Sequence, residues 1–276
     1  MSFFETKDHT SLYYRDWGTG APVVFVNSAV LSGAMWEYQM LPLSDQGLRC
    51  IAFDRRGHGR SDDPGRGYDM DTLADDLAQL LIQLDLREVT LVGQSMGCAE
   101  IARYLTRHGT SRIARVALIS PITPFLMQTE DNPEGAPREI FEAHLAAQLN
   151  DRPHYNGDAG VIKYFGLGSR WPGPEVVSSE MKQWLTRLIF ETSPKANIEC
   201  FRSFWQTDFR PDMRSFTVPT LIIHGANDQN APISCGRRTA QAIAGSQLKI
   251  YEGAAHGLFL THKDCLNEDL LAFVQG

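Results

Sequence analysis

Ser95 lies at the centre of residues 93–97, which read Gly-Gln-Ser-Met-Gly and fit the pattern G-x-S-x-G. The pattern alone is weak, but here it follows a predicted buried strand at residues 89–92 and opens a predicted helix at residues 98–107. In this strand–turn–helix setting the motif presents a serine hydroxyl for nucleophilic attack. Ser95 is therefore the candidate nucleophile.

The residues that flank this serine allow the sharp turn and can stabilise developing negative charge. Gly93 and Gly97 leave room for the sharp turn, where larger side chains would collide. The backbone N–H of Met96, at the start of the helix, would face a reacting carbonyl group. Met96 is therefore one candidate donor of an oxyanion hole, the set of N–H groups that binds developing negative charge.

A serine hydroxyl needs an adjacent base, and that base needs an acid to orient it. With this motif the chain order is Ser, then Asp or Glu, then His. His256 follows the last predicted strand and Asp228 follows the strand before it, so both belong to the same sheet edge as Ser95. Glu252 and Asp208 are the rival acids. We therefore predict Ser95, Asp228 and His256 as the catalytic residues.

The elements that must position these residues alternate along the chain. Short apolar runs bounded by Gly, Pro or Asn indicate buried strands, and amphipathic helices lie between them. This alternation argues for an α/β fold, with a mostly parallel central sheet and helices on both faces. Strands are predicted at residues 22–27, 49–54, 88–93, 115–120, 219–225 and 247–253, after an antiparallel hairpin at residues 2–6 and 12–17.

Two local predictions concern the segment after the strand at residues 49–54. The clearest helix is expected at residues 72–84, where leucines fall on one face, and Thr72 and Asp75 are expected to form a capping box at its start. Arg55 and Arg56 precede that helix, and we expect them to pair internally rather than bind an external anion. The expected partners are Asp54, Asp62 and Asp63.

The alternation stops between residues 122 and 213, a stretch rich in Pro, Gly and aromatic residues. We expect an α/β core formed by residues 1–121 and 214–276, and a helical cap formed by residues 122–213. The cap would lie over the carboxyl ends of the strands, where open α/β sheets bind ligands. Helical patterns occur in it at residues 137–149, 174–191 and 195–204. Four of its residues are expected to line an acyl pocket: Phe125, Leu126, Tyr164 and Phe204.

Composition excludes several other classes of protein. The net charge is −7, so the chain lacks the excess of basic residues that binding to nucleic acid or an anionic membrane requires. No apolar run approaches 18 residues, so no membrane span is expected. The N-terminus lacks the pattern of a signal peptide, and the 5 cysteines are scattered and odd in number, which favours free thiols and a cytoplasmic protein. The spacing of Cys and His predicts no metal site.

Together these residues resemble the α/β-hydrolase superfamily, and within it the cofactor-free bacterial arylesterases, also called non-haem haloperoxidases or perhydrolases. The likeness runs over nearly the whole chain and is densest at residues 53–62, 93–97, 206–212 and 266–273. The resemblance implies a Ser95–Asp228–His256 triad, a helical cap, and no haem, metal or other cofactor. It also implies a homo-oligomer, either a trimer or a dimer of trimers.

The chain departs from this family at residues 27–30, which read Asn-Ser-Ala-Val where the family usually carries His-Gly-Trp-Pro or a near variant. The resemblance places the second oxyanion donor at the backbone N–H of Ala29, which needs no particular side chain. One side of the pocket would be polar, because of Asn27, Ser28 and Asn230. This predicts a substrate with a polar group near its acyl carbon, such as a lactone or a hydroxy- or amide-bearing ester.

The predicted function is a serine hydrolase that cleaves small carboxylic esters or lactones through an acyl-enzyme. A cofactor-free perhydrolase that makes peracids is an alternative, although Val30 stands where the family has a proline associated with that activity. A carbon–carbon bond hydrolase with the same triad is a second alternative, and a non-catalytic ligand-binding protein on a hydrolase scaffold is a third. Dehalogenases and epoxide hydrolases of this fold use an Asp nucleophile, so Ser95 argues against both.

Overall fold

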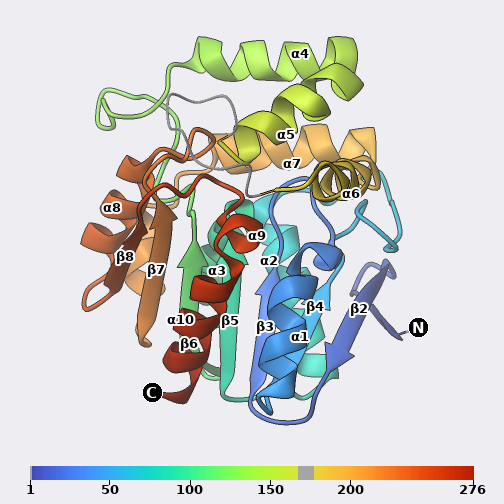
Figure 1. Cartoon of the computed structure of the whole chain (residues 1–276), viewed down its shortest axis with the longest axis vertical. Coiled ribbons are helices and arrows are strands. Elements are labelled where there is room, and N and C mark those ends of the chain that lie inside the picture. The colour runs from blue at the N-terminus through green and yellow to red at the C-terminus, as the bar shows by residue number, and fades with distance from the viewer. Residues whose placement is uncertain (1, 167–176) are drawn as a thin grey trace.

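A computed structural model describes residues 2–166 and 177–276. Its centre is an eight-stranded sheet in the order β1-β2-β4-β3-β5-β6-β7-β8 (Figure 1). The first two strands form an antiparallel hairpin at one edge, β2 is antiparallel to β4, and every later pair is parallel. The strands are β1 (Ser2–Glu5), β2 (Ser11–Trp17), β3 (Pro22–Val26), β4 (Arg49–Phe53), β5 (Val89–Gln94), β6 (Ile113–Ile119), β7 (Thr220–Gly225) and β8 (Gln247–Tyr251).

The predicted α/β fold with its mostly parallel sheet is confirmed, and each predicted strand is present to within two residues at either end. The strands β5 and β7, each paired on both sides, are buried at every position, which explains why their sequences show no alternation of apolar and polar residues. The hairpin lies at the sheet edge, as predicted.

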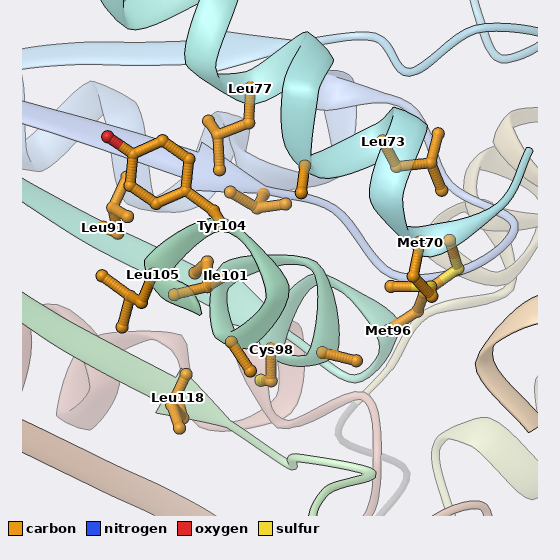
Figure 2. Close-up of a cluster of buried hydrophobic side chains, with 14 of the residues drawn as sticks. Met70, Leu73, Leu77, Leu91, Met96, Cys98, Ile101, Tyr104, Leu105 and Leu118 are labelled. Atoms are coloured by element: carbon orange, nitrogen blue, oxygen red, sulfur yellow. The ribbon is translucent and has the colours of Figure 1, made fainter. Parts of the chain in front are cut away.

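Helices cover both faces of this sheet (Figure 1). One face is packed by α2 (Met70–Gln83) and α3 (Met96–His108), and the other by α1 (Glu37–Asp45), α9 (Leu258–Thr261) and α10 (Lys263–Gln275). The helix α8 (Ile233–Ala242) connects β7 to β8. Figure 2 shows α2 and α3 side by side in one cluster of buried side chains, which includes Leu73 and Leu77 of α2 and Ile101 of α3. No helix in the described ranges is long and apolar enough to cross a membrane.

The start of α2 differs from the prediction. The helix begins at Met70, and Asp69 caps it by accepting a hydrogen bond of 2.9 Å from the backbone N–H of Thr72. The predicted capping box of Thr72 and Asp75 is therefore wrong. Thr72 lies three residues after the cap and donates its hydroxyl to Asp69 (2.8 Å), while Asp75 points outward to Arg107.

In the described residues, four α-helices follow β6 and precede β7, and they lie over the carboxyl ends of the strands (Figure 1). We call them the cap helices: α4 (Arg138–Asn156), α5 (Asp158–Tyr164), α6 (Ser179–Phe190) and α7 (Pro194–Gln206). Three of them match predicted helices, whereas α5 was not predicted and α4 continues to Asn156 beyond a kink at Asp151, where the backbone is not helical. Residues 174–176 of one predicted helix lie outside the described residues. That these helices form a separate cap domain stays a prediction.

Candidate active site

Ser95 occupies a strained turn between β5 and α3. Its φ is +57° and its ψ is −116°, a conformation that costs a non-glycine residue free energy and is found mainly where function requires it. Neighbouring segments hold this turn in place, since the Ser95 N–H donates a hydrogen bond to the carbonyl of Ile119 at 2.9 Å. A Cβ atom on Gly97 would lie 2.3 Å from the carbonyl oxygen of Val26, so only glycine fits there.

Asp228 and His256 form a buried pair at the carboxyl edge of the sheet. The distance from Nδ1 of His256 to Oδ2 of Asp228 is 2.6 Å, and the other carboxylate oxygen accepts backbone N–H groups of Asn230 (2.9 Å) and Ala231 (2.8 Å). Burial alone would raise the pKa of Asp228, but its interaction with His256 outweighs burial and holds the pKa below the ordinary value. An ionised Asp228 accepts the Nδ1 proton, which leaves Nε2 of His256 available as a base.

His224 is a second histidine near this carboxylate. Its Nε2 lies 3.5 Å from Oδ2 of Asp228 and 2.8 Å from the carbonyl oxygen of Ala231. Burial lowers the pKa of His224, which disfavours the charged ring, and its Nε2–H donates to the carbonyl oxygen of Ala231. His224 is therefore a packed, hydrogen-bonded residue. Within residues 2–166 and 177–276, no group of three or more His, Cys, Asp and Glu side chains is arranged to hold a metal ion.

The two predicted oxyanion donors lie on adjoining segments. Met96 is the first residue of α3, and Ala29 lies three residues after the end of β3. These segments touch, because a Cβ atom on Gly97 would also lie 2.8 Å from the carbonyl oxygen of Asn27. In the part of the chain that the structure describes, neither the Met96 N–H nor the Ala29 N–H donates to a protein acceptor. Their role as an oxyanion hole stays a prediction.

The cap meets this site through Tyr164, the last residue of α5. Its hydroxyl lies 3.3 Å from Oε1 of Gln94, and the Nε2 of Gln94 donates to the carbonyl oxygen of His256 at 3.1 Å. Gln94 thus links the cap helix α5 to the loop that carries His256, which we call the histidine loop. The sequence did not point to Gln94, because it fills the variable second position of the motif at residues 93–97, where no residue type carries a signal.

The remaining predicted pocket residues are spread over several elements. Asn27 is buried and donates to the carbonyl of Phe53 at 2.7 Å, whereas Asn230 is exposed and only its backbone N–H reaches Asp228. Ser28, Phe125 and Phe204 are buried, and Leu126 is half-buried. The structure brings Tyr164 against the histidine loop, whereas among the described residues no hydrogen bond or ring contact joins the site to Phe125, Leu126 or Phe204. The lining of the pocket stays a prediction.

The predicted partners of the two arginines after β4 are wrong. Arg55 pairs with Glu100 of α3 at 2.7 Å, and Arg56 pairs with Asp76 of α2 at 2.7 Å and with Asp8 at 3.1 Å. Internal pairing itself is correct. The three predicted partners accept hydrogen bonds from other groups instead. Asp54 accepts from the backbone N–H groups of Gly33 and Arg60. Asp62 accepts from the N–H of Ser11, and Asp63 accepts from the Tyr68 hydroxyl.

Comparisons with known proteins identify the fold and the family of the chain. The family model for the alpha/beta hydrolase fold matches residues 21–263. The chain is 41% identical to the non-heme chloroperoxidase CPO-A1 of Kitasatospora aureofaciens, over 99% of each chain. It is 34% identical to the bifunctional esterase/perhydrolase DCH of Acinetobacter calcoaceticus, over 100% of each.

A solved structure, the esterase EaEST of Exiguobacterium antarcticum, superposes with a TM-score of 0.93 at 32% identity and covers 100% of this chain and 99% of its own. The resemblance to non-haem haloperoxidases and esterases noted in the sequence is confirmed. Fold, motif geometry and relatives lead to one conclusion: the chain belongs to the α/β-hydrolase family.

Proposed function

We propose that the chain is a serine hydrolase that cleaves small carboxylic esters or lactones through an acyl-enzyme. The observation that carries the proposal is the buried contact of 2.6 Å between His256 Nδ1 and Asp228 Oδ2. It lies at the sheet edge where Ser95 is held at a φ of +57°. The strained serine, the oriented imidazole and the ionised carboxylate are the three parts that acyl transfer requires. Relatives named as esterases support the same reaction.

In the proposed mechanism, Nε2 of His256 takes the proton from Ser95 as the hydroxyl attacks the ester carbonyl. Asp228 holds the imidazole and stabilises its charged form. The Met96 and Ala29 N–H groups bind the oxygen that becomes negative, and each such donor contributes about 3 kcal/mol to lowering the barrier. His256 then gives the proton to the leaving alcohol, and water releases the acyl group by the reverse route.

Formation of peracids is a second candidate activity of the same site. Relatives named as a chloroperoxidase and an esterase/perhydrolase favour it. In that reaction hydrogen peroxide replaces water as the molecule that attacks the acyl-enzyme, and the acyl group leaves as a peracid while the proton passes through His256. Neither a metal nor a redox step enters this scheme, because the O–O bond of hydrogen peroxide passes intact into the peracid and the Ser95 hydroxyl is restored.

A substrate panel tests these activities. The purified protein is assayed with short aryl esters, with lactones, and with acetate plus hydrogen peroxide, and Ser95→Ala serves as the control. We expect hydrolysis of at least one ester or lactone, and at least about a 10⁴-fold loss in the variant. If the wild type cleaves none of these substrates, or if the variant retains full activity, the proposed function is wrong.

The proposal extends to the substrate. Asn27, Ser28 and Asn230 would favour a polar group near the acyl carbon, and the apolar lining would come from Phe125, Leu126, Tyr164 and Phe204. A hydroxy-substituted ester and its unsubstituted counterpart separate this idea from a wholly apolar pocket. A higher kcat/KM for the hydroxy ester in the wild type, lost in Asn27→Leu, is expected. Equal values for both esters would contradict it.

The proposal also covers partners and location. We propose that the protein acts on small molecules in the cytoplasm as a homo-oligomer, either a trimer or a dimer of trimers. The five cysteines support a reducing compartment, since all of them are free and four are buried. Light scattering coupled to size-exclusion chromatography measures the oligomeric state, and a mass near 31 kDa, that of one chain, would contradict the oligomer.

A further inference from the structure

The loop that carries Ala29 is held in place by side chains of the segment that follows β4. Arg55 donates from Nη2 to the carbonyl oxygen of Asn27 at 3.0 Å and from Nη1 to that of Ser28 at 3.3 Å. The Nε2 atom of His58 lies 2.7 Å from the carbonyl oxygen of Ala29. Three successive carbonyl groups of this loop, those of residues 27, 28 and 29, therefore contact two buried side chains.

These contacts fix the direction of the backbone N–H groups. A trans peptide is planar, so the carbonyl of Ser28 and the N–H of Ala29 point in opposite directions from the same bond. The cis peptide bond of the described chain is at Thr123–Pro124, so the Ser28–Ala29 bond is trans. When Arg55 holds the Ser28 carbonyl, the Ala29 N–H must point away from Arg55.

Arg55 is itself anchored to the helix that carries the other donor. Its Nε and Nη2 atoms lie 2.9 Å and 2.7 Å from Oε2 of Glu100, and both side chains are at most 1% exposed. Glu100 lies four residues, about one turn, after Met96 on α3. One buried ion pair therefore connects the loop of Ala29 to the helix of Met96.

We propose that Arg55, anchored by Glu100, is a positioning residue of the oxyanion hole and sets the direction of the Ala29 N–H relative to that of Met96. This inference rests on the proposed serine hydrolase function. Arg55 acts through the backbone of Ser28, so it contributes to the transition state without binding the substrate. Its removal should lower kcat and leave KM unchanged, because the oxyanion exists only in the transition state.

The neighbouring Arg56 provides a matched control. It is equally buried, it pairs with Asp76 at 2.7 Å, and its side chain has no contact with residues 27–29 in the described structure. Arg55→Lys and Arg56→Lys each retain one charge but lose the guanidinium fork, so both are expected to lower the melting temperature. We expect kcat for an aryl ester to fall between about tenfold and about 10²-fold in Arg55→Lys. In Arg56→Lys it should stay within about twofold.

A second variant covers the case that Arg55→Lys does not fold. The double variant Arg55→Gln with Glu100→Gln removes both charges together, so it leaves no unpaired buried charge. It should show the same fall in kcat with unchanged KM. Hydrogen exchange of the peptide containing residues 27–30 should become faster in both Arg55 variants and not in Arg56→Lys.

The outcomes separate the two proposals. If wild-type protein hydrolyses the ester while an Arg55 variant and Arg56→Lys keep the same kcat, the positioning role is overturned and the proposed function survives. If the wild type has no hydrolase activity, the proposed function is overturned, and with it the catalytic part of this inference. Unchanged exchange at residues 27–30 in the Arg55 variants would show that Arg55 does not hold this loop in place.

Discussion

The ring of Tyr164 stands edge-on against the imidazole of His256, with 5.0 Å between the ring centroids and 87° between the ring planes. The carbonyl oxygen of Tyr164 also accepts the N–H of Gly257 at 2.8 Å. Edge-to-face pairs of aromatic rings contribute about 0.5–1.5 kcal/mol beyond the burial of their surface. A cap helix therefore packs directly on the candidate base, so movement of the cap and the position of His256 are coupled.

Replacement of Tyr164 should reduce activity in two steps. Tyr164→Phe keeps the ring and loses the hydrogen bond to Gln94, so kcat/KM should fall by no more than about tenfold, since a neutral hydrogen bond contributes about 0.5–1.5 kcal/mol. Tyr164→Ala also removes the ring that packs on His256, and the loss should be larger. Steady-state kinetics with an aryl ester measures both.

Ile162 supplies the control on the same helix, because its side chain is 43% exposed. Ile162→Ala should leave kcat/KM within about twofold of the wild type. If Tyr164→Ala behaves like Ile162→Ala, the contact between the cap and His256 has no part in catalysis.

Asp228→Asn should lower kcat by about 10⁴-fold. The amide keeps the shape of the side chain but presents either its oxygen or its NH₂ group to Nδ1, so it no longer enforces the tautomer with a free Nε2. The comparison is Asp208→Asn, which alters the rival acid. Asp208 is bound to Arg210, so this change should leave kcat within a few-fold. A reversal of the two results would move the acid of the triad to Asp208.

The stability of the protein should depend on pH through Asp76. Burial raises the pKa of Asp76 from 3.8 to about 6, against the opposing effect of Arg56. Between pH 4 and pH 6 the folded state then binds more protons at this site than the unfolded state, so the free energy of unfolding falls as pH rises. Asp76→Asn removes this titration. The melting temperature of the wild type minus that of the variant should therefore shrink from pH 4 to pH 6.

Asp75 is the adjacent control, because its pKa shift has the opposite direction to that of Asp76. Burial would raise its pKa, but hydrogen bonds from Arg107 and His108 outweigh burial and lower the pKa below 3.8. Its contribution to stability is present above the unfolded pKa and is lost only as pH falls through the folded pKa. The difference between wild type and Asp75→Asn should therefore not shrink from pH 4 to pH 6. The same downward trend for both variants would contradict the assignment to Asp76.

The sequence was sufficient for the parts of the molecule that local patterns encode. The strands were recognisable because their buried residues are contiguous, and Ser95, Asp228 and His256 were recognisable because each follows a strand at its carboxyl end. The geometry of the turn at Ser95 follows from steric limits at Gly97, which apply wherever this turn forms.

Long-range side-chain contacts could not be predicted in the same way. Glu100 lies 45 positions from Arg55, and only the packing of α3 against the sheet brings them together. The available signal was a carboxylate on the otherwise apolar, buried face of α3, since such a group requires a partner. The contacts of the pocket residues are even harder to predict. Tyr164 lies on α5, a helix too short to show a clear periodic pattern, and its contacts depend on how the cap helices pack.

Labelling of Ser95 by a fluorophosphonate tests the central claim most directly. The reagent reacts with a serine only where a base activates the hydroxyl and an oxyanion hole holds the phosphoryl oxygen. Folded wild-type protein is treated at neutral pH, and peptide mass spectrometry locates the adduct. We predict stoichiometric labelling on Ser95 that is lost in His256→Ala and after unfolding. A folded wild-type protein whose Ser95 stays unlabelled would contradict the proposal that this chain is a serine hydrolase.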